Sequence, residues 1–221
     1  MTLDCIHIKT GDNPQHAIIW LHGLGADGHD FEPIAPQLAE NLPAVHFVFP
    51  HAPVMPVTIN GGMSMRAWYD IKSTELNAVQ DAQGIQRSSL QILQLMQDLV
   101  ESGIPIENQI LAGFSQGGAI ALHTAIRMET ACAGIIALSS YLPLADEAES
   151  SITAAGKSQN IFYGHGTQDP VVPIGLGELS RGILAKLGLS ISWHSYPMPH
   201  AVCPQEIDDI AQWLTSRLQQ E

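Results

Sequence analysis

Short apolar runs alternate with longer stretches of helical period along this chain. Seven runs rich in β-branched and other apolar residues are predicted as strands: Leu3–Ile8, Ala17–Leu21, Val45–Phe49, Gln109–Gly113, Gly134–Leu138, Asn160–Tyr163 and Ser190–Tyr196. Five longer stretches are predicted as helices: Phe31–Asn41, Ala78–Ser102, Gln116–Met128, Ile174–Leu187 and Pro204–Leu218. Such alternation is typical of an α/β fold with a mostly parallel central sheet and helices on both faces.

Two stretches interrupt the alternation and are predicted as long loops. His51–Asp70 is rich in Pro, Gly and Met, and Ser139–Lys157 is rich in Ala, Ser and Glu. Loops of this length in a compact protein are usually functional or mobile.

The composition indicates one globular domain, residues 1–221. Of the 221 residues, 45% are hydrophobic and only 14% are charged, which is enough apolar material for a core. The net charge of -13 comes from 22 acidic against 9 basic residues. Because this negative charge repels phosphate backbones, we expect no nucleic-acid partner.

The N-terminus and the cysteines bear on the compartment. Asp4, His7 and Lys9 interrupt the apolar stretch that a signal peptide needs, and no 18-residue apolar run occurs. The three cysteines (Cys5, Cys132 and Cys203) are an odd number without a zinc-binding pattern. We therefore expect a cytoplasmic protein with no disulfide framework and no stable membrane insertion.

The sharpest local signal is Gly-Phe-Ser-Gln-Gly at residues 113–117. A predicted strand precedes it and a predicted helix follows it. This strand, G-x-S-x-G, helix context is that of a nucleophile elbow, in which a tight turn exposes the serine oxygen above the sheet. The helix also points its positive N-terminal end at that oxygen. The pattern favours Ser115 as a nucleophile over a surface serine in a glycine-rich turn.

A serine hydroxyl needs a base to take its proton, and four histidines follow Ser115. His123 falls within the next helix, and His165 precedes the best acid candidate, against the order Ser, Asp or Glu, His. His194 lies inside a predicted strand. His200 lies in the loop between the last strand and the last helix, so we favour His200 over His194.

The imidazole also needs an acidic partner to hold its tautomer. The acidic candidates between the serine and the histidine are Glu129, Asp146, Glu147, Glu149, Asp169 and Glu178. Asp169 alone follows directly on the end of a predicted strand. The alternative is that Asp169 only caps the helix after Pro173.

The oxyanion of a tetrahedral intermediate needs two backbone N–H groups. One comes from the residue after the nucleophile, here Gln116. The other is expected in the glycine-containing turn at residues 21–25, where Leu24 is the chosen donor. His22 is interpreted as a structural residue of that turn.

Ordered motifs give a resemblance over nearly the whole chain. Residues 21–25, 49–53, 66–70, 113–118 and 164–173, with His200 and the helix after it, resemble the phospholipase/carboxylesterase family of small α/β-hydrolases, which includes acyl-protein thioesterases. The resemblance implies a triad of Ser115, Asp169 and His200, with Leu24 and Gln116 as oxyanion donors. One departure is Pro199, where glycine is expected before the histidine.

The resemblance also implies esterase or thioesterase activity without a cofactor or metal, and frequent homodimers. We expect a serine carboxylesterase or thioesterase for short- to medium-chain acyl substrates, with lysolipids or lipidated proteins as alternatives. Met63, Trp68 and Val171 are the expected wall of the acyl groove. For the methionines of His51–Asp70, pinning the loop to the core is an equal alternative.

Three other classes of protein fit this sequence less well. A cysteine hydrolase would use Cys203 near His200, but no elbow surrounds that cysteine. A hydrolase scaffold kept as a binding module would normally lack a triad member. A metal-dependent hydrolase is disfavoured because the ten histidines are scattered and H-E-x-x-H is absent from the sequence.

Overall fold

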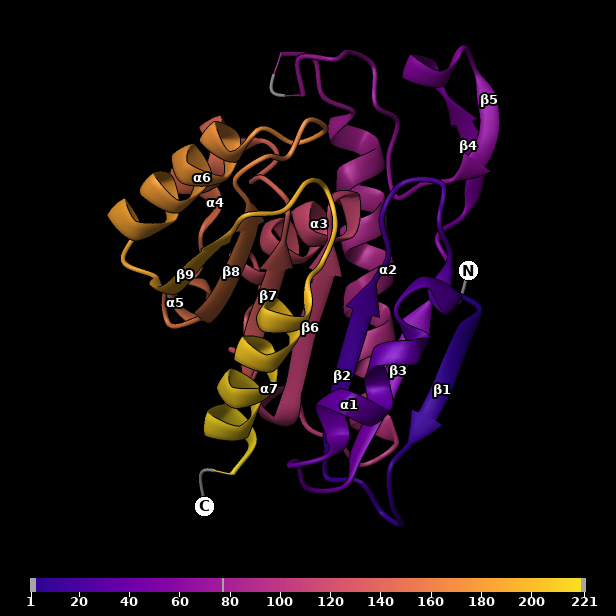
Figure 1. Cartoon of the computed structure of the whole chain (residues 1–221), viewed down its shortest axis with the longest axis vertical. Coiled ribbons are helices and arrows are strands. Elements are labelled where there is room, and N and C mark those ends of the chain that lie inside the picture. The colour runs from indigo at the N-terminus through magenta and orange to yellow at the C-terminus, as the bar shows by residue number, and fades with distance from the viewer. Residues whose placement is uncertain (1–2, 77, 220–221) are drawn as a thin grey trace.

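A seven-stranded sheet runs through the middle of the protein (Figure 1). The computed structural model describes residues 3–76 and 78–219, so the remaining residues of the predicted domain 1–221 lie outside the described part. The strands are β1 (Cys5–Lys9), β2 (His16–Leu21), β3 (Val45–Pro50), β6 (Gln109–Phe114), β7 (Gly134–Leu138), β8 (Asn160–Gly166) and β9 (Ser190–Tyr196). Their order is β1-β3-β2-β6-β7-β8-β9. β1 is antiparallel to β3, and all other neighbours are parallel.

Helices cover both faces of this sheet, as predicted for an α/β fold. They are α1 (Ala35–Ala39), α2 (Ala82–Glu101), α3 (Gln116–Ala125), α4 (Ala148–Ser151), α5 (Ala154–Lys157), α6 (Ile174–Lys186) and α7 (Pro204–Leu218). In Figure 1, α1 and α7 lie in front of the sheet and α2 and α3 lie behind it. Parallel strands of this kind bring the carboxyl ends of β6, β7 and β8 to one edge, where ligands bind in open α/β sheets.

Alternation along the strands divides the core into two layers. On β2, Ile18 and Trp20 pack with α1 and α7, whereas Ala17, Ile19 and Leu21 pack with α2 and α3. Both sets are fully buried. A central strand buried on both sides reads as a continuous apolar run, which is why the sequence pattern located it.

The predicted helix Phe31–Asn41 is wrong as a single element. The structure has 3₁₀ turns at Gly28–Asp30 and Glu32–Ile34, followed by the short α1. Pro33 and Pro36 carry no N–H, so a continuous ladder of helical hydrogen bonds cannot form there.

The two predicted loops also contain regular structure. His51–Asp70 holds a second, two-stranded sheet of β4 (Val54–Val57) and β5 (Met63–Arg66), joined through a 3₁₀ turn at Thr58–Asn60. Ser139–Lys157 holds a 3₁₀ turn at Ala145–Glu147 and the short helices α4 and α5. Pro56 lies inside β4, which hides the strand from pattern analysis.

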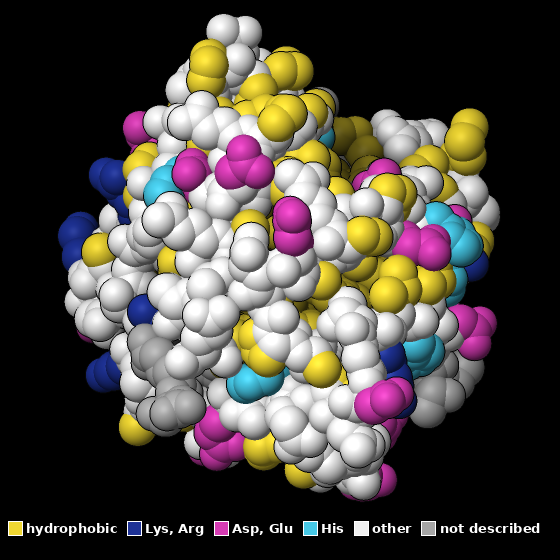
Figure 2. Space-filling view, turned by 60° about the horizontal axis from the view of Figure 1, so that its bottom comes forward, with side chains coloured by type: hydrophobic (Ala, Val, Ile, Leu, Met, Phe, Trp, Pro, Cys, Tyr) yellow, Lys and Arg dark blue, Asp and Glu magenta, His cyan; other side chains and the backbone are white. Residues whose placement is uncertain are grey.

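Within the described residues, every helix is too short or too polar to cross a membrane. Figure 2 shows one face of the molecule, on which acidic side chains are scattered and basic ones are few.

Candidate active site

Ser115 lies in a tight turn between β6 and α3. Its backbone has φ 53° and ψ −118°, a left-handed conformation that costs energy in a residue with a side chain. The glycines on either side permit close backbone contact. A Cβ on Gly117 would lie 2.3 Å from the carbonyl oxygen of Leu21, and one on Gly113 would lie 2.4 Å from the carbonyl carbon of Gly117. The turn therefore has the shape of a nucleophile elbow.

The structure brings the three predicted triad residues into one hydrogen-bonded chain. His200 Nε2 lies 2.9 Å from Ser115 Oγ, and His200 Nδ1 lies 2.7 Å from Asp169 Oδ2. The Asp169 side chain is fully buried, whereas that of His200 is 16% exposed. With a proton on Nδ1 donated to the carboxylate, Nε2 is free to accept the proton of the serine hydroxyl.

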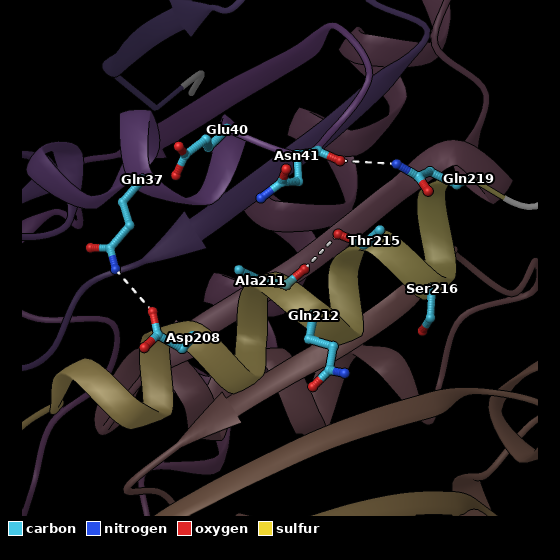
Figure 3. A pocket seen from close by; sticks show the side chains of 9 residues that line it. All are labelled: Gln37, Glu40, Asn41, Asp208, Ala211, Gln212, Thr215, Ser216 and Gln219. Atoms are coloured by element: carbon cyan, nitrogen blue, oxygen red, sulfur yellow. Dashed lines mark hydrogen bonds between the residues drawn. The ribbon is translucent and has the colours of Figure 1, made fainter.

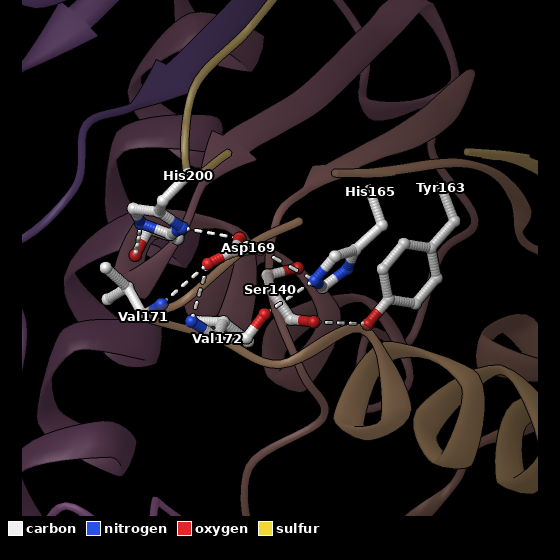
Figure 4. A network of polar contacts seen from close by, with 8 residues as sticks. Ser140, Tyr163, His165, Asp169, Val171, Val172 and His200 are labelled. Carbon is white, nitrogen blue, oxygen red and sulfur yellow. Dashed lines mark hydrogen bonds and ion pairs between the residues drawn. The ribbon is translucent and has the colours of Figure 1, made fainter. Parts of the chain in front are cut away.

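Asp169 divides its two oxygens between two tasks (Figure 4). Oδ1 accepts hydrogen bonds from the N–H groups of Val171 and Val172, both at 2.8 Å, and Oδ2 faces His200. The N-cap residue of α6 is Pro173. The alternative that Asp169 merely caps this helix is therefore wrong, although its carboxylate does organise the turn before it.

The competing residues His194 and Cys203 lie in other surroundings. His194 contacts Ser192 Oγ at 2.8 Å and stacks on Phe162 with ring centroids 4.5 Å apart. Both ring nitrogens of His200 are used by Ser115 and Asp169, so neither is free to activate Cys203.

Pro199 leaves His200 within reach of the serine. A Cβ on Gly166 would lie 2.5 Å from the carbonyl oxygens of Met198 and Pro199, so this glycine lets the 198–199 segment pack closely on β8. The His200 ring also packs on Phe114, with centroids 4.7 Å apart. These contacts hold the ring without the expected glycine.

The turn after β2 lies directly against the elbow. A Cβ on Gly23 would lie 3.3 Å from the Phe114 ring and 3.5 Å from Ser115 Cβ, and the Gly25 N–H donates to Arg66 at 2.9 Å. Leu24 lies between these two anchored glycines. On the other side, Gln116 begins α3, whose first N–H groups have no partner within the helix. Gln116 is thus adjacent to Ser115, and Leu24 follows a glycine that lies against the elbow; their role as oxyanion donors stays a prediction.

Trp68 differs from its predicted place in an open acyl groove, because its side chain is only 1% exposed. Its indole N–H donates to the carbonyl oxygen of His22 at 2.9 Å. Its backbone N–H donates to Gln116 Oε1 at 2.8 Å, while Gln116 Nε2 donates to the Tyr69 carbonyl at 2.7 Å. Trp68 and the Gln116 side chain thus fasten residues 51–70 to the elbow, a function of Gln116 that the sequence did not reveal.

His22 has the structural role expected of it. Its Nδ1 donates to the Gly23 carbonyl at 2.7 Å, and its Nε2 accepts from the Ala52 N–H at 3.0 Å. Burial lowers the pKa of His22 to about 4, so the ring stays neutral. Both nitrogens are engaged, and the ring pins the turn beside the elbow.

Met63 and Val171, the other predicted groove residues, are 65% and 56% exposed. Met63 lies on the β4–β5 hairpin. Val171 lies two residues after Asp169 and donates its N–H to that carboxylate. Val171 therefore borders the triad, whereas Met63 is exposed on the hairpin.

A cavity of about 430 Å³ lies between α6 and the segment that follows β7. It is lined by Ala78, Gln80, Tyr141, Leu142, Leu144, Ala145, Asp146, Glu147, Leu176, Leu179, Ser180 and Ile183. Ser115 N–H donates to the Leu138 carbonyl at 2.8 Å, and Tyr141 follows Leu138 by three residues. Chain connectivity therefore puts the Tyr141 end of the cavity within about 11 Å of that carbonyl. We call this space the acyl cavity.

A larger groove, about 900 Å³, lies between α1 and α7 (Figure 3). Its lining includes Glu40, Asp208, Gln37 and Gln212, and Gln37 donates to Asp208 at 3.3 Å. We call it the α1–α7 groove. None of the triad residues lines this groove or the acyl cavity, but only the acyl cavity is lined by the segment that follows β7 from the elbow.

Comparison with known proteins agrees with the fold and with the motifs. The model of the phospholipase/carboxylesterase family matches residues 3–218. Acyl-protein thioesterase 1 of Cryptococcus neoformans is 37% identical over 96% of this chain and 97% of its own, and that of Neurospora crassa is 38% identical over 91% and 86%. The crystal structure of Zea mays acyl-protein thioesterase 2 superposes with a TM-score of 0.84 at 27% identity, covering 97% of this chain and 99% of its own. The resemblance read from the motifs is confirmed, and the chain belongs to the phospholipase/carboxylesterase family.

Proposed function

We propose that this protein hydrolyses carboxylic esters and thioesters through an acyl-enzyme formed on Ser115. The observation that carries the proposal is the continuous hydrogen-bonded chain from Ser115 through His200 to the buried Asp169. Family membership gives the same reaction class.

In the first half of the reaction, Ser115 Oγ attacks the acyl carbonyl carbon as His200 Nε2 takes its proton. The carbonyl oxygen becomes an oxyanion, which the N–H groups of Leu24 and Gln116 meet. The tetrahedral intermediate collapses, the bond to the leaving oxygen or sulfur breaks, and His200 gives its proton to the alcohol or thiol. Asp169 stabilises the imidazolium that exists between these steps.

In the second half, water replaces the alcohol or thiol. His200 takes a proton from the water as its oxygen attacks the acyl-enzyme, and a second oxyanion forms. Collapse breaks the bond to Ser115 Oγ, which regains its proton from His200. The carboxylic acid leaves, and no electrons are exchanged with a cofactor.

The acyl cavity supports a preference for acyl groups of short to medium length. Its apolar lining comes from Tyr141, Leu144, Leu176 and Ile183 among others, and Tyr141 follows by three residues the Leu138 carbonyl that is bonded to Ser115. Burial of each methylene contributes up to about 0.8 kcal/mol, so rates should rise with length until the cavity is filled. Relatives named acyl-protein thioesterase favour acyl groups on protein thiols as a second candidate substrate. Homodimerisation and a cytoplasmic location remain predictions.

The test is turnover of matched acyl esters and thioesters by wild type and Ser115→Ala. We expect the substitution to lower kcat by about 10⁴- to 10⁶-fold, because only oxyanion stabilisation and binding remain. The melting temperature should change little. Substantial hydrolysis by a folded, homogeneous Ser115→Ala protein would remove Ser115 from the mechanism.

A further inference from the structure

His165 is a buried histidine that the proposed reaction does not use. It lies near the end of β8, its side chain is fully buried, and its Nε2 is 3.8 Å from Asp169 Oδ2, the oxygen that faces His200 (Figure 4). Burying a polar ring costs free energy unless the ring is hydrogen-bonded. The hydrogen bonds of His165 therefore indicate what the residue does.

The hydrogen bonds of His165 establish which nitrogen carries the proton. Nε2 lies 2.9 Å from the carbonyl oxygen of Val172, an acceptor only, so Nε2 carries the proton. Nδ1 is buried and has no hydrogen-bond partner among the residues that the structure describes. A second proton on Nδ1 would have no acceptor, and burial lowers the pKa of His165. The ring is therefore neutral beside the triad.

Packing leaves this ring little freedom. On one side a Cβ on Gly177 of α6 would lie 2.6 Å from Nδ1, so the helix backbone is pressed against the ring. On another side Trp193 stacks on it, with centroids 6.1 Å apart and planes 26° apart. The charged or titratable groups that act on His165 are Asp169, His200 and Glu178 of α6. A clamped donor fixes the position of the carbonyl that it binds.

That carbonyl belongs to the turn that holds Asp169. Val172 donates its N–H to Asp169 Oδ1 and accepts the His165 proton on its carbonyl oxygen. We propose that His165 is a positioning residue, which fixes the 169–172 turn so that Asp169 Oδ2 faces His200 and which, being neutral, leaves the charge of the carboxylate to His200. This proposal rests on the proposed function of the triad.

Two amide variants of His165 distinguish the effect of its hydrogen bond to Val172 from the effect of its ring. The side-chain nitrogen of His165→Gln occupies the bond position of Nε2, whereas that of His165→Asn occupies the position of Nδ1. We expect His165→Asn to lose kcat by about 100-fold with little change in KM, because a misplaced catalytic group costs about this much. His165→Gln should recover most of that loss. Equal rates for His165→Asn and wild type would overturn the proposal.

A second pair leaves His165 in place. Gly177→Ala pushes a methyl group against Nδ1, whereas Gly182→Ala adds the same group on the same helix with nothing within 4 Å. We expect Gly177→Ala to lower kcat and Gly182→Ala to leave it unchanged. If His165→Asn fails to fold, this pair decides the matter, and equal kcat values for the two alanine variants would overturn the proposal.

The last readout does not depend on turnover. In a Ser115→Ala background, the far-downfield proton resonance of a histidine N–H bound to carboxylate reports the His200 to Asp169 contact. We expect it to persist with His165→Gln and to move or disappear with His165→Asn or Gly177→Ala. An unchanged resonance in the last two would refute the positioning role. Retained hydrolysis by Ser115→Ala would instead refute the proposed function, so the two failures are distinguishable.

Discussion

Two cavities of this molecule differ in size and in how the chain connects them to the nucleophile elbow. The α1–α7 groove is the larger, about 900 Å³ against about 430 Å³ for the acyl cavity. Its two carboxylates, Glu40 and Asp208, are on the surface. The acyl cavity is instead connected to the elbow along the chain, because Tyr141 follows by three residues the Leu138 carbonyl that accepts from the Ser115 N–H. The elbow itself holds a strained serine, an imidazole with both nitrogens engaged, and a fully buried carboxylate.

The larger of the two cavities is not the one connected to the triad, so cavity volume does not identify the catalytic site of this protein. Chemistry requires groups that are held in place and kept from water, which raises the strength of their interactions. The elbow region provides this through backbone contacts at Gly113 and Gly117 and through the Gln116 side chain.

The largest effect is expected at the base. His200→Ala should lower kcat/KM by about 10³- to 10⁴-fold or more, because no other group takes the serine proton. His194→Ala, which removes a ring stacked on Phe162, should retain activity within a few-fold. Steady-state hydrolysis of an activated ester measures both, and the reverse ranking would move the base to His194.

The next effect concerns two aspartates, one in each region. Asp169→Asn should lower kcat by about 10²- to 10⁴-fold, since an amide neither stabilises the imidazolium nor holds its tautomer. Asp208→Asn in the α1–α7 groove should leave kcat unchanged. Equal kcat values for the two variants would deny any special role to the buried carboxylate, and melting curves check that both proteins fold.

Helix α7 offers a test of burial alone. Glu206 on its inner side is fully buried, and within the described part of the chain neither of its carboxylate oxygens has a hydrogen-bond partner. Burial, with Asp209, raises the pKa of Glu206 to about 8. Folding favours the protonated form of Glu206. The contribution of this protonation to the free energy of unfolding is therefore complete below pH 4.5 and is lost as the pH rises to about 8. Glu206→Gln should therefore stabilise the protein by roughly 2–5 kcal/mol at pH 8 and have little effect at pH 4.

Denaturant unfolding at several pH values measures this difference. The control is Gln97→Ala on the exposed side of α2, which replaces an uncharged side chain and should give a flat difference across the same range. If the stability of Glu206→Gln relative to wild type is the same at pH 4 and pH 8, the carboxyl group of Glu206 does not have the raised pKa that this prediction requires.

The smallest effect concerns acyl length. Ala145→Phe narrows the acyl cavity, and Ala211→Phe adds the same bulk to the α1–α7 groove. We expect Ala145→Phe to reduce the preference for longer chains over acetyl by about four-fold per excluded methylene, the equivalent of about 0.8 kcal/mol. Rates over a graded ester series measure the profile. If Ala211→Phe changes the acyl-length profile and Ala145→Phe does not, the acyl chain binds in the α1–α7 groove and not in the acyl cavity.

Much of this architecture was accessible from local sequence. The helix predicted over Pro204–Leu218 has those bounds in the structure, because an apolar stripe and Pro in the first turn mark it. The elbow was accessible because tight backbone contact demands glycine at positions 113 and 117. The chain order of the three polar residues selected the same trio that the structure brings together.

The rest depends on contacts between distant segments. The burial of Trp68 and its bond to the Gln116 side chain join residues 48 positions apart, and the middle positions of G-x-S-x-G carry no local signal. Pro56 disguised the β4–β5 hairpin. Chain order excludes His165 as the base and indicates no other role for it, whereas its bond to Val172 links it to the turn that holds Asp169.

The most direct test of the account is covalent labelling by a fluorophosphonate, followed by intact mass and peptide mapping. Such reagents need a serine oxygen activated by a base. We predict one adduct per chain, on the peptide that contains Ser115, absent in Ser115→Ala and strongly slowed in His200→Ala. Labelling at another residue, or equal labelling rates in wild type and His200→Ala, would contradict the claim that His200 activates Ser115.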